Sequence, residues 1–240
     1  MRVEETNAPP RTRQPSAWLI NQWAMAGIVS AASRFIPVPY AEEAVRYRCR
    51  RFVVSRTLSS HKSSVSADSL TPYYDTDGFF NSWTSKILRA PFKLLLFPIR
   101  KTVRIITSVR NVPLEIIQIV LLGRTLDRCL QMQSLTLDPT TAKRMRKAFD
   151  DAFSGMDFYV VRAALIDALK SVSGLKSAAI AMATRVSRKE EPTAEALEPS
   201  DKVQSGAANV QSVLDRPETL ALFAEFDRRF DQSLQQRSAG

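Results

Sequence analysis

A chain of 240 residues can bury a sizeable core and form one large domain or two small ones. Its 7 glycines argue against glycine-rich loops, many hairpins and a Rossmann domain, and this scarcity favours long helices. The net charge of +10 argues for an anionic partner, either nucleic acid or a membrane surface, although such a charge can also serve only to keep a protein soluble.

The positive charge is concentrated in the first part of the chain. Residues 1–147 carry 23 Lys and Arg against 10 Asp and Glu, whereas residues 148–240 carry 11 against 14. The two cysteines, Cys49 and Cys129, show neither metal-ligand spacing nor a disulfide framework. We therefore predict two small apolar side chains inside helices, in a reducing, cytoplasmic compartment.

The first expected helix is unusually apolar. Residues 1–14 are polar and predicted to form a loose tail, and Ser16 is a suitable N-cap for a helix that ends at Phe35. The absence of charge from residue 14 to 33 is also typical of a signal peptide or a membrane span. Because Asn21 and Gln22 interrupt its middle, we predict a packed amphipathic helix, with entry into a membrane as the alternative.

An arginine-rich helix is expected next. The prolines of Ile36–Tyr40 end the first helix, and a second is predicted from Ala41 to Ser59, with its apolar residues on one face. Its arginines lie mostly around the rest of the circumference, and guanidinium groups can bind phosphates in a bidentate way. The candidate nucleic-acid-binding residues are Arg46, Arg48, Arg50 and Arg51.

A second basic surface is predicted after a polar loop. The sequence favours helix from residue 79 to 111, interrupted by Pro91 and Pro98, with cations opposite the apolar residues if the prolines only kink the helix. Charges in every 20-residue window argue against a membrane span. The alternatives are a core helix with a solvated basic face and a surface helix on anionic lipid. The candidate anionic-surface-binding residues are Lys86, Arg89, Lys93, Arg100, Lys101 and Arg104.

The following helix is predicted to lie at the centre of the core. Leu114–Leu122 is apolar around nearly its whole circumference, and it is too short to span a membrane. Further helices are expected at 139–153, 157–172 and 175–188. They complete a helical domain from residue 15 to 188.

The C-terminal part is expected to stand apart from this domain. Residues 189–213 contain almost no large apolar side chain and are predicted to form a flexible linker. Residues 214–240 are predicted to hold a detached amphipathic helix that begins with a capping box of Asp215 and Glu218. One face of this helix is expected to dock on its own domain, a second copy or another protein through Leu220, Phe223, Phe226, Phe230 and Leu234.

No catalytic motif is recognisable. The single histidine, His61, has no cysteine or acidic residue beside it in the sequence and is predicted to be a plain surface residue. The D-x-D of Tyr73–Phe80 lacks the flanking residues of a phosphatase or a calcium loop, so a turn at Asp77-Gly78 is expected. We predict no metal site, no cofactor and no enzymatic activity, although a site assembled across the fold need not show in sequence.

Together these features predict an all-α protein with an irregular multi-helix domain, a linker and a detached C-terminal helix. The leading functional hypothesis is a non-enzymatic, peripheral membrane-associated or scaffolding protein at the cytoplasmic face of a membrane. It would contact anionic lipid through a basic helix face and dock a protein partner, or a second copy, through its C-terminal helix. The alternative is a nucleic-acid-binding protein that uses the arginines of residues 41–59. An enzyme without a visible motif is the least favoured.

Overall fold

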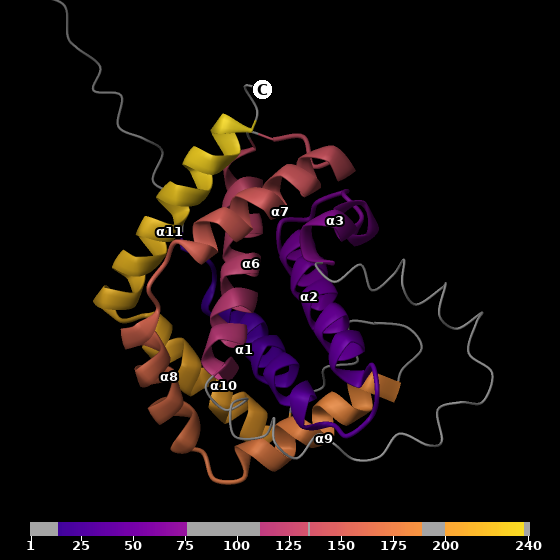
Figure 1. Ribbon diagram of the computed structural model, residues 1–240, viewed down its shortest axis with the longest axis vertical. Coiled ribbons are helices and arrows are strands. Elements are labelled where there is room, and N and C mark those ends of the chain that lie inside the picture. Colours follow the sequence, from indigo (N-terminus) through magenta and orange to yellow (C-terminus); the bar gives the residue numbers. More distant parts are fainter. Residues whose placement is uncertain (1–13, 76–110, 134, 189–199, 238–240) are drawn as a thin grey trace, which may run out of the picture.

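The structure, a computed structural model, describes residues 14–75, 111–133, 135–188 and 200–237. Every regular element within these residues is a helix, which confirms the all-α multi-helix fold (Figure 1). In chain order the elements are α1 (Ala17–Ala32), η1 (Ser33–Phe35), α2 (Ala41–Ser60), η2 (Ala67–Leu70), α3 (Thr71–Tyr74), α6 (Val112–Met132), α7 (Pro139–Ser154), α8 (Tyr159–Lys170), α9 (Leu175–Arg188), α10 (Asp201–Leu214) and α11 (Pro217–Gln236).

Helix α1 lies at the centre of the core. Ser16 caps it, because its hydroxyl accepts a hydrogen bond from the Leu19 backbone amide at 3.3 Å. Every residue from Trp23 to Ala32 is buried, and the helix packs against α2, α6, α9 and α10. The helix is therefore packed, as predicted, but it is buried on nearly all sides rather than on one face. No described helix is long and apolar enough to cross a bilayer.

Helix α6 is the second central element, as its all-round apolar pattern predicts. Ile116, Ile117 and Ile119 to Leu122 are all buried. The helix approaches α1 closely at Gly123, where an added Cβ would lie 2.4 Å from an indole carbon of Trp23. The Trp23 indole N–H donates to the Thr57 hydroxyl at 3.1 Å. Helices α1, α2 and α6 therefore meet around a buried ring whose hydrogen-bond donor has a partner.

Helix α10 corrects the predicted linker. It occupies residues 201–214, and all but the last of these fall in the range 189–213 where a flexible segment is expected. Its buried side chains are small, and Val203, Ala207 and Val210 follow a helical spacing. At Gly206 an added Cβ would come within 2.8 Å of a Leu175 methyl group, so the small residues allow α10 to pack tightly beside α1, α8 and α9. Small apolar residues thus form a packing face here, although the same residue types are also common in linkers.

Helix α11 is amphipathic as predicted, but it is not detached. Phe223, Phe226 and Phe230 are buried, and the Phe226 ring lies 5.3 Å from the Phe149 ring of α7 in an edge-on arrangement. Leu220 and Leu234 are partly buried. The predicted docking face exists, and within the described residues it packs on the helix's own domain. A short helix with three phenylalanines on one face cannot remain in water when such a surface is tethered nearby.

Candidate anionic-surface interface

The predicted anionic-surface-binding residues lie outside the described residues. All six of these cations, from Lys86 to Arg104, fall between residues 76 and 110. The turn expected at Asp77-Gly78 falls in the same range. These sequence predictions stay predictions.

The arginines of α2 are engaged inside the domain. Arg46 lies 3.0 Å from Glu42 and 3.7 Å from Glu115, a buried carboxylate of α6. Arg50, only 6% exposed, lies 4.0 Å from the same Glu115. Glu115 also accepts a hydrogen bond from the Ser30 hydroxyl at 2.6 Å. One carboxylate therefore links α1, α2 and α6.

The other two arginines of this group have internal partners as well. Arg48 donates to the backbone carbonyl of Val186 near the end of α9, and burial lowers the pKa of its guanidinium. Arg51 pairs with Asp68 of η2 at 2.9 Å. To bind a nucleic-acid phosphate, the four arginines would have to leave these partners, so in this conformation they act as structural cations.

His61 has an acidic partner that the sequence did not indicate. Its Nε2 lies 2.7 Å from the Oδ1 of Asp127, a buried residue of α6 that also accepts from the Gln131 side chain. The ring is therefore held between the end of α2 and α6 rather than being a plain surface group. No hydroxyl or thiol of the described residues hydrogen-bonds to it, so the pair lacks the nucleophile that a catalytic base would activate.

A different set of cations lies on the part of the α9 circumference that is not buried. This helix buries Leu175, Met182 and several small residues, and its sequence contains no acidic residue. Lys176, Arg185 and Arg188 are exposed, and no described carboxylate lies within ion-pair distance of them. Lys176 instead lies 4.7 Å above the Phe35 ring of η1. Helix α9 therefore presents positive charge to solvent that no carboxylate of the described residues pairs with.

An exposed apolar loop runs alongside α9. Val38 and Tyr40 are 55% and 52% exposed, in a loop whose prolines are also exposed. The chain enters the loop from Phe35, under Lys176 at the start of α9, and leaves it into α2, where Arg48 reaches the end of α9. The loop thus lies beside the basic helix. Tyr40 has a left-handed backbone with φ of 62°, which is uncommon for a residue other than glycine.

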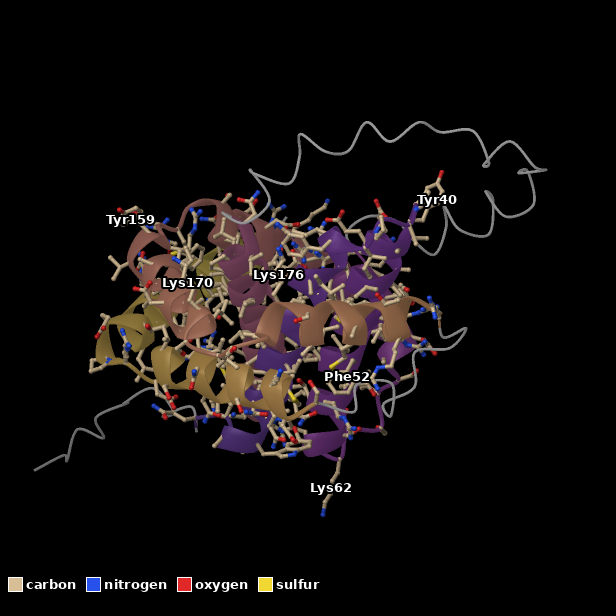
Figure 2. All side chains as sticks on the ribbon, turned by 90° about the horizontal axis from the view of Figure 1, so that it is seen from below. Tyr40, Phe52, Lys62, Tyr159, Lys170 and Lys176 are labelled. Carbon is tan, nitrogen blue, oxygen red and sulfur yellow. The ribbon has the colours of Figure 1, made fainter. Side chains whose placement is uncertain are left out.

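A second exposed apolar pair begins α8. Tyr159 and Val160 are 74% and 65% exposed, which makes them the most exposed large apolar side chains of the described residues. Figure 2 shows Tyr159 and Tyr40 at the same edge of the molecule, with Lys170 and Lys176 between them across the view but nearer its middle. We call the exposed apolar and basic residues of α8, of α9 and of the loop beside α9 the α8–α9 face; its members are Val38, Tyr40, Tyr159, Val160, Lys170, Lys176, Arg185 and Arg188.

The described residues offer little room for a small ligand. A hollow between α1, α6 and α11, lined by Trp23, Arg124 and Phe223, has a volume of about 20 Å³. That is room for about one water molecule, whereas small-molecule sites usually measure hundreds of Å³. No group of three His, Cys, Asp or Glu side chains in the described part of the chain could hold a metal ion. The α8–α9 face is the candidate binding surface that the described residues offer.

This face was not predicted from the sequence, although the sequence holds two signals for it. The absence of acidic residues from Leu175–Arg188 is visible in the sequence, as is the succession Pro37-Val38-Pro39-Tyr40 between two helices. Only the fold shows that the two lie side by side. Comparison with protein-family models, with curated proteins and with solved structures finds no match to this chain.

Proposed function

We propose that the protein associates peripherally with anionic lipid surfaces through the α8–α9 face. The observation that supports this most directly is that exposed cations of α8 and α9 without a described carboxylate partner occur together with exposed large apolar side chains of α8 and of the loop beside α9. Anionic headgroups attract cations, and the region beneath them accepts tyrosine rings and aliphatic groups. Nucleic acid would use the cations, but it has no comparable place for Val38 and Val160.

The expected affinity is weak and reversible. A cation near an anionic leaflet contributes about 1 kcal/mol, so the four cations of the face would contribute about 4 kcal/mol. That corresponds to a dissociation constant of about 1 mM from charge alone. Apolar contacts would add to this value. The cations predicted between Lys86 and Arg104 would add further if they reach the same surface.

Co-sedimentation with vesicles tests the proposal. Phosphatidylcholine vesicles with and without phosphatidylserine would be mixed with the wild-type protein and with the triple variant Lys176→Gln, Arg185→Gln, Arg188→Gln. Loss of about 3 kcal/mol of electrostatic attraction corresponds to a reduction in affinity of about 100-fold. The wild type should sediment only with the vesicles that contain phosphatidylserine.

A matched variant separates position from net charge. Lys62, Lys143 and Lys147 are exposed and have no described carboxylate partner, and changing all three to Gln removes the same charge. They belong to α7 and to the end of α2, and Figure 1 places α7 at the opposite end of the molecule from α9. If both triple variants bind equally weakly, the face has no special role and only net charge matters.

Gel-shift measurements distinguish the nucleic-acid alternative. Binding of duplex or single-stranded nucleic acid with no binding to vesicles would favour that alternative over lipid. In that case the affinity should fall steeply with salt. Changing Arg46 and Arg51, which are more exposed than Arg50, to Gln should then weaken binding, with circular dichroism as the check that the variant is folded.

A further inference from the structure

We infer that the loop Ile36–Tyr40 is a membrane-insertion element, whose Val38 and Tyr40 side chains enter the boundary between lipid headgroups and acyl chains. This inference rests on the proposed association with anionic lipid and adds the segment that penetrates and the orientation of the domain. The loop would point into the bilayer, with α9 lying along the headgroups.

The loop is held rigidly at both ends while its middle is exposed. Ile36 and Ala41 are both buried. Ile36 donates its amide to the Ser33 carbonyl at 3.0 Å, and Ala41 donates to the Val38 carbonyl at 3.3 Å. Pro37 and Pro39 each fix one backbone angle, and Ile36 is extended, as a residue before proline prefers. Little conformational entropy would therefore be lost when this loop enters a membrane.

The two exposed side chains suit the interface of a bilayer. Tyrosine has an apolar ring and a polar hydroxyl, and it is enriched where acyl chains meet headgroups. Val38 supplies a purely apolar group at the tip of the same loop. The nearest α9 cation, Lys176, lies over Phe35, just before the loop begins. Penetration of Val38 and Tyr40 would bring this ammonium group to the level of the lipid phosphates.

The other residues of the α8–α9 face favour a lipid surface over a small partner as the binding partner. Tyr159 and Val160 are a second apolar pair, and Figure 2 places Tyr159 at the same edge as Tyr40. The two pairs come from loops or helix ends well separated in sequence, and cations lie between them in that view. A flat, anionic and deformable partner can contact both pairs and the cations at once.

A site-specific fluorescent label can test insertion directly. Val38→Cys would be labelled with an environment-sensitive NBD group, and Lys62→Cys would be the matched control. Lys62 follows the other end of α2, about 30 Å away for a helix of 20 residues, and Figure 2 shows it on the edge opposite Tyr40. The native thiols should not compete, because Cys49 and Cys129 are buried and burial raises the pKa of both, that of Cys129 to about 12.

The expected result is position-specific. On adding vesicles with phosphatidylserine, the label at position 38 should shift to shorter wavelength and brighten severalfold, while the label at 62 should not change. Nitroxide groups on the upper acyl chain should quench only the label at 38. Co-sedimentation without any change at 38 would overturn insertion and leave the proposed function intact. Absence of co-sedimentation would overturn both. A shift at 38 that grows with protein concentration without vesicles would mean that a second copy covers the loop.

A pair of unlabelled variants provides an independent measurement. Asparagine tolerates the left-handed backbone that Tyr40 adopts, so Val38→Ser with Tyr40→Asn should remove the apolar groups without unfolding the loop. Affinity for phosphatidylserine vesicles should fall about tenfold or more, with an unchanged Tm. The control is Trp18→Ser, which removes an exposed aromatic ring from the other end of α1. Equal affinity in the two variants would contradict insertion of the loop.

Discussion

Four of the arginines of α2 and the cations of α9 are similar in sequence but opposite in their surroundings. In α2, Arg46 and Arg50 lie near the buried carboxylate of Glu115, and Arg48 and Arg51 also have internal partners. In α9, Lys176, Arg185 and Arg188 face solvent without a described carboxylate. An excess of basic residues in a helix therefore does not by itself locate a binding surface. The position of the counter-charge in three dimensions decides whether a cation is structural or available.

The difference follows from where each helix lies. Helix α2 packs against α1, α6 and α9, so its long side chains are partly covered and need partners inside the domain. Helix α9 packs through small and medium side chains on one side and leaves its other side in water. In water its cations cost nothing to leave unpaired, and they remain free to attract an external anion.

The largest expected effect is on the carboxylate that holds the α2 arginines. Glu115→Gln should lower the free energy of unfolding by about 3 kcal/mol, because two guanidinium groups and the Ser30 hydroxyl lose a buried acceptor with full charge. Urea denaturation measures this. The control is Glu43→Gln in the same first turn as Glu42, at an exposed position, which should change stability by less than about 0.5 kcal/mol. Equal effects would mean that the arginines do not depend on Glu115.

A somewhat smaller effect on the free energy of unfolding is expected when Arg50, a partner of Glu115, is changed instead. Arg50→Gln should destabilise the protein by about 2 kcal/mol, since Glu115 remains buried and, of these two arginines, keeps only the more exposed Arg46 beside the Ser30 hydroxyl. The measurement is again urea denaturation, with Arg185→Gln on α9 as the matched arginine. If Arg185→Gln destabilises as much as Arg50→Gln, the contrast between the two helices is wrong.

Salt should affect the α9 cations and the buried ion pairs around Glu115 differently. Raising the salt concentration from about 0.05 M to about 0.5 M shortens the screening length well below 10 Å, so vesicle binding through α9 should weaken at least tenfold. The buried pairs around Glu115 are screened much less, and the free energy of unfolding should change by less than about 1 kcal/mol. Vesicle binding that is insensitive to salt would show that the α9 cations do not drive association.

The smallest expected effect is on the stability of the α9 variant itself. The triple change Lys176→Gln, Arg185→Gln, Arg188→Gln should alter the free energy of unfolding by no more than about 0.5 kcal/mol, because these cations have no described ion pair to lose. Thermal unfolding measures it. A loss of several kcal/mol would place these residues with the structural cations of α2.

Local sequence patterns predicted the helices that depend on large apolar residues. The all-round apolar run that begins α6, the extent of α2 and the phenylalanine face of α11 all follow from side-chain spacing. Helix α10 was missed because its buried face consists of Val, Ala and Gly with a single Leu at its end, and such composition is also typical of a linker. The pairing of Arg46 with Glu115 and of His61 with Asp127 joins residues far apart in the chain. Such pairs depend on helix packing, which no local pattern records.

The packing of α1 against α10 has a consequence for synthesis of the protein. The most buried helix of the described structure is made before one of its main neighbours, which lies about 170 residues later in the chain. At ribosomal speeds of roughly 5–20 residues per second, α1 waits on the order of 10–30 s before α10 emerges. During that interval its apolar surface is incompletely covered. The nascent chain should therefore engage chaperones or a membrane at this helix before the domain closes, and shortening the chain before α10 should yield an insoluble product.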